Sequence, residues 1–223
     1  RARFFGGLHH VVAWATLSPM KVSSHCGGSC QTNGYLLETS EGAVVIDAPA
    51  GMFKFCRRAK CKPTGLLLTH QHFDHIEDAS LFQAAGVPIY ASAPFSPSLQ
   101  LTDLALRWGL EIRYPEFTVN EVLKLSTGGI RIAGTDFEIH PVPGHSPDSF
   151  VFHVALFQKL FAGDTLFSAG GIGRTDFPHG DHDLLISSIK SELSPLPYHT
   201  ELLSGHGPPG VLGYEIDINP YLK

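Results

Sequence analysis

The sequence predicts an α/β protein in which two β-sheets pack face to face and helices cover their outer surfaces. Short apolar runs bounded by turn residues alternate with segments of helical apolar spacing, and the second half of the chain repeats the alternation of the first. Two such halves bury their apolar faces when their sheets pack together under helices. A chain of 223 residues, 43% hydrophobic and 17% charged, is long enough for one sizeable domain of this kind.

The first half of the chain alternates strands and helices. Apolar or β-rich runs bounded by turn residues predict strands at residues 31–38, 43–46, 65–68 and 87–91. Helical apolar spacing, ended by glycine or proline, predicts helices at residues 52–60, 76–85 and 99–108. The first two strands are separated only by residues 39–42, so we expect them to form a hairpin.

The second half is richer in strands. Apolar runs predict strands at residues 130–133, 137–141, 150–155, 160–162 and 201–204. Residues 181–193 are the clearest late helix, because their leucine and isoleucine side chains fall on one side. Several of the expected strands end in polar residues that can carry chemistry.

Charge, apolar-run length and cysteine spacing disfavour several classes of protein. The net charge of −5 provides no basic field for nucleic acid or an anionic membrane. No apolar run reaches the roughly 18–20 residues that a membrane span needs. The four cysteines are too few for a disulfide framework and lack zinc-knuckle spacing. We therefore expect free thiols in a reducing compartment, the cytoplasm.

The N-terminal residues 1–19 differ from the rest of the chain. Arg1 and Arg3 precede a short, interrupted apolar run. This segment could be the remnant of a targeting signal, an extra edge strand or an extension. We expect an extension, followed by a single domain over residues 20–223.

A dense run of metal-binding residue types follows the strand expected at residues 65–68. It reads Thr69-His70-Gln71-His72-Phe73-Asp74-His75. In an extended chain His70 and His72 point to one side, whereas Asp74 and His75 come where the chain turns into a helix. A solvated histidine-rich turn is the alternative interpretation. The spacing favours two adjacent metal ions over one.

Three further polar residues each lie in a turn directly after an expected strand. They are His145, Asp164 and His206, and each has a glycine beside it. Glycine lets the backbone approach a crowded site without a Cβ clash. Each residue alone would be interpreted as a turn residue, but together with the histidine run they predict one metal site.

Longer segments around these residues resemble one protein family. They include Gly144-His145-Ser146-Pro147, Gly163-Asp164-Thr165-Leu166-Phe167, Gly171-Ile172-Gly173-Arg174-Thr175-Asp176-Phe177-Pro178 and Gly205-His206-Gly207-Pro208. With the histidine run, they resemble the metallo-β-lactamase superfamily, and within it the glyoxalase II-like hydrolases more than the lactamases. The resemblance extends from about Met20 to the C-terminus. It implies a four-layer αββα sandwich with a binuclear metal site along one edge.

The resemblance also implies a ligand set. His70, His72 and His145 would hold the first ion, Asp74, His75 and His206 the second, and Asp164 would bridge both. Imidazole and carboxylate ligands suit two divalent ions, Zn²⁺ first and Fe or Mn as alternatives. Such ions share a water of pKa about 7 and polarise the scissile carbonyl. Asp74 would then act catalytically, by orienting the nucleophile or moving a proton.

Further residues are implied to act around the metals. Asp47 matches the aspartate that orients a metal-binding histidine, although a strand-end Asx turn fits it equally. Arg174 stands where relatives place a cation for an anionic part of the substrate, and its alternative is a surface pair with Asp176 or Asp181. Tyr214 would line the site or pack the tail.

The sequence departs from the family pattern in two ways. Glu77, Asp78 and Asp148 replace glycines, and we expect them to add negative charge near the metals. Because few residues follow His206, we expect the helical region that grips glutathione in full-length glyoxalase II to be missing. The sequence therefore does not identify the thiol part of the substrate.

These observations predict a metal-dependent hydrolase that cleaves a small-molecule thioester or related acyl ester, as a monomer or a homodimer. A mononuclear-iron persulfide dioxygenase is the first alternative, because such relatives can keep the same ligand residues. A lactonase or a β-lactamase comes next. The net charge disfavours a nucleic-acid-processing enzyme, and His72, where flavodiiron relatives carry glutamate, disfavours an electron-transfer role.

Overall fold

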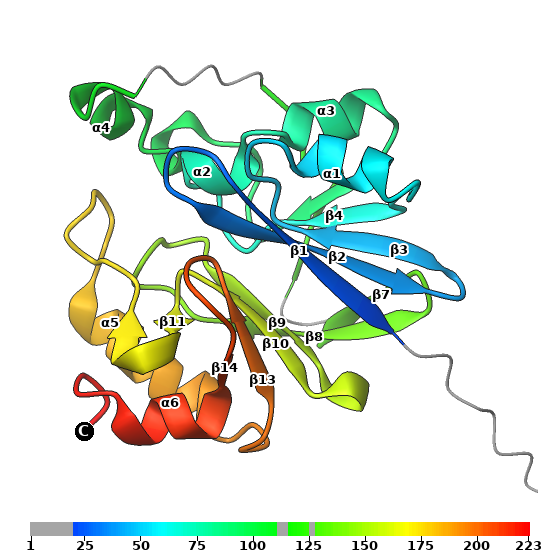
Figure 1. Cartoon of the computed structure of the whole chain (residues 1–223). Helices are drawn as coiled ribbons and strands as arrows, with labels where there is room; N and C mark the ends of the chain where they lie inside the picture. Colours follow the sequence, from blue (N-terminus) through cyan, green and yellow to red (C-terminus); the bar gives the residue numbers. More distant parts are fainter. Residues whose placement is uncertain (1–19, 111–115, 125–127) are drawn as a thin grey trace, which may run out of the picture.

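Two β-sheets packed face to face, with helices on both outer sides, form the computed structural model of the protein (Figure 1). The structure describes residues 20–110, 116–124 and 128–223. The arrangement is the αββα sandwich that the sequence predicts. The expectation of an N-terminal extension concerns residues 1–19, which lie outside the described ranges.

The first sheet carries its strands in sequence order. They are β1 (Lys21–Gly27), β2 (Thr32–Thr39), β3 (Gly42–Ile46), β4 (Gly65–Leu67), β5 (Ile89–Ala91) and β6 (Glu121–Val122). The first three pair antiparallel, and β3 to β6 run parallel. The expected hairpin is confirmed as β2 and β3. The sequence analysis misses β1, because this edge strand is polar or half-exposed and shows no apolar alternation.

The second sheet has the order β14-β13-β10-β9-β8-β7. Its strands are β7 (Gly129–Ile132), β8 (Thr135–Pro141), β9 (Phe150–Val154), β10 (Lys159–Gly163), β13 (Glu201–Ser204) and β14 (Gly210–Val211). A separate pair is formed by β11 (Leu166–Phe167) and β12 (Gly171–Ile172). Among the described strands of the second sheet, β10 and β13 pair in parallel and the other neighbours pair antiparallel. β11, β12 and β14 are not predicted, since two residues are too few to show a period.

Helices cover the outer face of each sheet. The first sheet carries α1 (Met52–Arg58) and α3 (Ala79–Ala84), and α2 (Phe73–Ile76) and α4 (Thr102–Arg107) lie on the same side (Figure 1). The second carries α5 (His182–Ser188), a π-helical turn (Ile189–Leu193) and α6 (Leu212–Ile218). Short 3₁₀ turns occupy Pro97–Leu99, Ala155–Phe157 and Ser168–Gly170. Within the described ranges, no helix has both the length and the apolar character required to cross a membrane.

Two of the expected helices differ from the structure. The helix expected at residues 76–85 is divided into α2 and α3, because the backbone of Asp78 (φ −97°, ψ 3°) leaves the helical region between them. The Asp78 carboxylate accepts a hydrogen bond from the Phe53 N–H (2.8 Å), so it fixes α1. The helix expected at residues 99–108 begins only at Thr102, after the turn at Pro97–Leu99.

Alternation along the strands sends apolar side chains to both faces of each sheet. On β2, Leu37 points between the sheets and Leu36 points toward the outer helices. The layer between the sheets contains Phe137, Phe152 and Phe161, all buried. Packing of this layer fixes one sheet against the other, and with it the loops at the shared sheet edge.

We expect Phe161→Ala to lower the free energy of unfolding by about 3–5 kcal/mol. Phe161 is fully buried between the sheets and contacts the Tyr35 ring edge-on at 5.4 Å between centroids. Urea denaturation provides the measurement. As a control, Leu156→Ala should change stability by less than about 0.5 kcal/mol, because Leu156 is 62% exposed. Equal losses in the two variants would contradict the described packing.

Candidate metal centre

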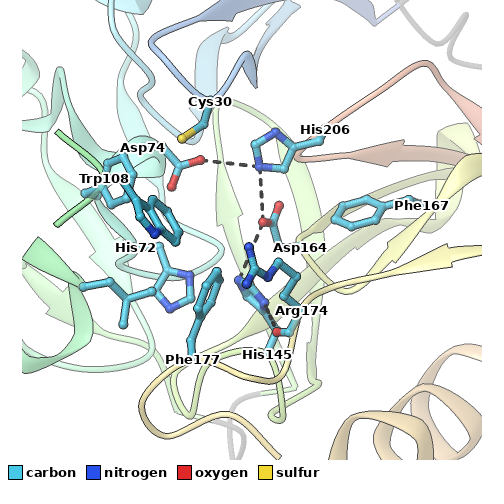
Figure 2. A pocket seen from close by; sticks show the side chains of 12 residues that line it. Cys30, His72, Asp74, Trp108, His145, Asp164, Phe167, Arg174, Phe177 and His206 are labelled. Atoms are coloured by element: carbon cyan, nitrogen blue, oxygen red, sulfur yellow. Dashed lines mark hydrogen bonds and ion pairs between the residues drawn. The ribbon is translucent and has the colours of Figure 1, made fainter. Parts of the chain in front are cut away.

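The predicted ligands come from loops and from one short helix at the same edge of the two sheets. His70 and His72 follow β4, and Asp74 and His75 lie in α2. The ligands that follow strands of the second sheet are His145 after β8, Asp164 after β10 and His206 after β13. The structure brings all of these side chains together. Figure 2 shows the five that line the pocket, namely His72, Asp74, His145, Asp164 and His206.

The ligand atoms fall into two adjacent groups. One group contains His70, His72 and His145, and the other contains Asp74, His75 and His206. A third set, formed by His70, His75 and Asp164, takes one histidine from each group and so joins them. Within each group, all ligand atoms lie within 4.8 Å of one another. The first two groups contain the residues that the resemblance assigns to each ion, whereas His70, His75 and Asp164 span that division.

Asp164 lies between the two groups. Its Oδ1 is 3.2 Å from His75 Nε2, and its Oδ2 is 3.2 Å from His206 Nε2 and 3.6 Å from His145 Nε2. Asp74 approaches the same region, with Oδ2 3.4 Å from His206 Nε2. One carboxylate therefore contacts histidines of both groups, which is the geometry that a bridging ligand requires.

Glycines permit this close approach. A Cβ atom at Gly205 would lie 2.2 Å from Asp164 Oδ1. Gly163 has a positive φ of 48°, and a Cβ there would lie 2.4 Å from Thr69 Oγ1. Any side chain at Gly205 would displace the Asp164 carboxylate. This glycine, which precedes His206, therefore allows the backbone to approach the crowded site, as the sequence analysis expects.

The orientation of the imidazoles fits a metal. Within the described residues, the Nε2 atoms of His70, His75 and His145 are buried and form no hydrogen bond, although those of His75 and His145 face the Asp164 carboxylate at 3.2 and 3.6 Å. Their Nδ1 atoms contact acceptors outside the cluster, such as the Arg174 carbonyl, 2.7 Å from His145 Nδ1. Nitrogens left without partners in the interior are costly unless a ligand binds them. The donor set therefore suits divalent ions that prefer imidazole and carboxylate ligands.

Asp47 joins three parts of the site. Its Oδ1 accepts a hydrogen bond from the Thr69 N–H, and its Oδ2 is 2.8 Å from both Thr69 Oγ1 and His75 Nδ1. These contacts hold the loop after β4 and the ring of His75 in one orientation. The carboxylate faces the metal cluster, as expected of an orienting aspartate. Asp47 itself adopts a positive φ of 56° at the end of β3.

Burial keeps the first group neutral. It lowers the pKa of His70 and His72 well below the ordinary value, and neighbouring imidazoles lower it further. Burial also lowers the pKa of His145. Neutral imidazole is the form that binds metal, so these histidines need not lose a proton first.

The second group is held together by ion pairs. Burial acts to lower the pKa of His75 and His206, but Asp74 and Asp164 outweigh it. They raise the pKa of His206 to about 10 and that of His75 well above its ordinary value. Burial acts to raise the pKa of Asp74, but His75 and a hydrogen bond with His206 lower it to about 2. A metal ion bound by this group would replace protons.

A pocket of about 260 Å³ opens onto the cluster. Besides ligands, its walls contain side chains that the sequence analysis did not assign to the site, namely Cys30, Phe73, Leu101, Trp108, Phe167 and Phe177 (Figure 2). Apolar residues such as Phe177 give no sequence signal of this role, because an apolar residue is most often a core residue. The pocket is therefore polar at its metal-binding end and apolar along its walls.

Of the two residues expected to contact the substrate, one lies at the pocket and the other does not. Arg174 lines the pocket, but its guanidinium also forms two hydrogen bonds with the Asp176 carboxylate (2.7 and 2.9 Å). It lies 4.5 Å above the Phe177 ring. Tyr214 lies on α6, is 54% exposed and does not line the pocket. The structure thus places Arg174 at the site and Tyr214 away from it.

The acidic residues that replace family glycines do not line the pocket. Asp148 is buried and accepts a hydrogen bond from Ser146 Oγ (2.5 Å), and Asp78 binds the Phe53 N–H. Burial raises the pKa of Glu77, Asp78 and Asp148. Asp78 and Asp148 accept hydrogen bonds from local donors, whereas Glu77 lies close enough to interact electrostatically with Asp74 and His75. The expectation of added charge near the metals thus stays a prediction for Glu77.

Comparison with known proteins identifies the family. The model of the metallo-β-lactamase superfamily matches residues 27–206, and the chain belongs to this superfamily. The probable metallo-hydrolase YqgX of Bacillus subtilis is 34% identical over 203 residues, covering 88% of this chain and 94% of the relative. The hydroxyacylglutathione hydrolase GloC of Haemophilus influenzae is 41% identical over 167 residues, covering 71% and 75%.

Two solved structures share the fold. The BLEG-1 B3 metallo-β-lactamase superimposes with a TM-score of 0.81 at 32% identity, covering 91% of this chain and 99% of that one. TTHA1623, solved in a di-iron-bound form, superimposes with a TM-score of 0.75 at 37% identity, covering 90% and 100%. These similarities confirm the resemblance from which the sequence analysis inferred the fold.

We expect Asp47→Asn to weaken metal binding by about 10–100-fold, because the amide cannot accept hydrogen bonds at both terminal atoms, and one histidine loses its orientation. Equilibrium dialysis against buffered Zn²⁺ measures the affinity. Asp103→Asn is the matched control, since Asp103 is exposed in the first turn of α4. Wild-type affinity in Asp47→Asn would show that this carboxylate does not support the centre.

Proposed function

We propose that this chain is a metal-dependent hydrolase of small-molecule thioesters or related acyl esters. The observation that supports it most directly is the position of Asp164 between two ligand groups at the end of an apolar pocket. We assign one divalent ion to His70, His72 and His145. A second is assigned to Asp74, His75 and His206, and both ions share Asp164.

The bound ions would lower the pKa of a coordinated water and polarise the acyl carbonyl. The ligand types favour Zn²⁺, and the similarity to a di-iron-bound structure supports iron as the alternative. The four free cysteines support a reducing compartment, and we propose the cytoplasm.

Asp74 is the residue to which we assign a catalytic role beyond metal binding. It lines the pocket, and Thr32 Oγ1 donates a hydrogen bond to its Oδ2 at 2.5 Å. With a pKa of about 2, the carboxylate is ionised at neutral pH. It can therefore accept a hydrogen bond from an attacking water and orient it toward the acyl carbon.

The walls of the pocket indicate the kind of acyl group. Phe73, Leu101, Trp108 and Phe177 present apolar surface, which favours an apolar or aromatic group over a charged one. Asp176 already pairs with Arg174, so the rim has little net charge to attract an anion. The similarity to GloC supports thioesters as the substrate class.

Hydrolysis of β-lactams is the second candidate, favoured by the similarity to the BLEG-1 lactamase. The same metals and the same pocket would serve an amide carbonyl in place of a thioester carbonyl. The persulfide dioxygenase stays a prediction of the sequence analysis. It requires a single iron, so metal content separates it from the hydrolases.

We expect the purified protein to contain two metal ions per chain and to release thiol from acyl thioesters. Elemental analysis after expression without added metal gives the content, and a thiol reagent follows turnover. His72→Ala and Asp164→Ala should abolish turnover and keep the wild-type far-UV circular dichroism spectrum, because each removes a ligand but no core packing. Asp103→Asn is the activity control.

Several outcomes would contradict this proposal. Two metals without turnover of any thioester or lactone would exclude acyl hydrolysis, and turnover of a β-lactam alone would favour the second candidate. One iron with oxygen consumption on a persulfide would favour the dioxygenase. Wild-type turnover in either variant would remove that residue from the site.

We expect Trp108→Ala to lower kcat/KM for aromatic acyl thioesters by about tenfold or more, because it removes an apolar pocket wall. The acetyl thioester, which is too short to reach that wall, should change by less than about twofold. Leu106→Ala is the control, since Leu106 is exposed on α4 and does not line the pocket. Equal losses for both substrates would show that Trp108 does not select the acyl group.

A further inference from the structure

A second cluster of metal-binding residue types lies on the helix-covered face of the second sheet. Glu138 and His140 are on β8, and His153 stands opposite Glu138 on β9. Their neighbours Ile139 and Phe152 point between the sheets, so these three side chains point the other way, toward the outer helices. None of them lines the pocket of the metal centre.

The distances within this cluster suit coordination. One ligand atom from each of Glu138, His140 and His153 lies within 4.8 Å of the other two. His153 Nδ1 is 2.7 Å from Glu138 Oε2, and His140 Nε2 is 4.0 Å from the same oxygen. The three ligand atoms are therefore close enough together to hold one ion.

Glu192 holds the imidazole of His140 in an orientation that suits metal binding. Glu192 lies in the π-helical turn Ile189–Leu193, and its Oε2 is 3.3 Å from His140 Nδ1. A carboxylate that holds one nitrogen of an imidazole fixes the ring and leaves the other nitrogen free to bind a metal. The Nε2 atom of His140 is buried and has no hydrogen-bond partner within the described residues.

We propose that Glu138, His140 and His153 bind a divalent ion of the zinc type, with Glu192 orienting His140. Two imidazoles and a carboxylate without thiolate suit Zn²⁺, and the half-exposed Glu138 leaves a fourth position open to water. The ion would connect β8 and β9, and through Glu192 it would hold the π-helical turn against the sheet.

Burial limits the affinity of this site. When His153 binds through Nδ1, its proton stays on Nε2, which is buried and has no acceptor within the described residues. That donor remains unpaired, which opposes binding. We therefore expect this site to bind Zn²⁺ more weakly than the centre at the pocket and to fill after it.

Equilibrium dialysis against buffered free Zn²⁺ tests the proposal on the metal-loaded protein. Wild-type protein should bind one more zinc per chain than His140→Ala or Glu138→Gln. Asp136→Asn is the matched control, because Asp136 lies on the same face of β8 and is 75% exposed, and it should keep the wild-type number. Glu192→Gln should keep the site but weaken it about tenfold.

The comparison between variants does not depend on how many ions the pocket holds or on which reaction occurs there. Thioester turnover should equal that of the wild type in His140→Ala and Glu138→Gln, so loss of zinc without loss of turnover supports a separate site. The proposal is overturned if wild type, His140→Ala and Glu138→Gln bind the same number of zinc ions at every concentration of free zinc. The cluster would then be only a hydrogen-bond network.

Discussion

The carboxylate of Asp47 is the contact on which the metal centre depends. It stands at the end of β3 and accepts hydrogen bonds from the backbone and side chain of Thr69 and from the ring of His75. A buried carboxylate is stable only when such donors surround it, so its position and theirs are set together. These contacts connect the end of β3, the end of β4 and the helix α2, and they hold the three in fixed positions relative to one another. Each ligand group has members in this segment, so the positions of both groups depend on these contacts.

The second half of the ligand set is placed by the packing of one sheet on the other. Hydrogen bonds cross between the sheets beside the site: the Asn33 N–H donates to the Gly205 carbonyl (2.7 Å), and Tyr35 Oη donates to the Ser204 carbonyl (2.6 Å). The Phe150 N–H donates to the Thr69 carbonyl (2.8 Å). Apolar burial in the layer between the sheets brings these polar groups within reach. The core therefore determines whether the Asp164 carboxylate can contact histidines from both sheets.

The sequence predicts the metal cluster better than its surroundings, for physical reasons. His70, His72 and His75 stand out because they are clustered after one strand, and His145 is assigned only in combination with them. Trp108 and Phe177 give no comparable signal, since apolar residues line cores and pockets alike. The polar edge strand β1 and the two-residue strands lack the periodicity on which strand prediction depends. Tyr214 was expected at the site from resemblance alone, and α6 places it on the surface instead. Long-range contacts decide such positions, and a single sequence does not contain them.

One part of the pocket wall comes from a segment of the chain that contains none of the proposed metal ligands. The proposed ligands occupy short loops and the helix α2, which are held by buried glycines and by Asp47, so that almost any substitution there disturbs several neighbours. Leu101 and Trp108, by contrast, come from the two ends of α4, and Trp108 is 46% exposed. Mutations around α4 can therefore alter which molecules fit without loss of the ions. Substrate specificity can therefore change gradually through substitutions around α4 while the metal ligands stay in place. Residues 101–108 are accordingly the region to randomise in directed evolution.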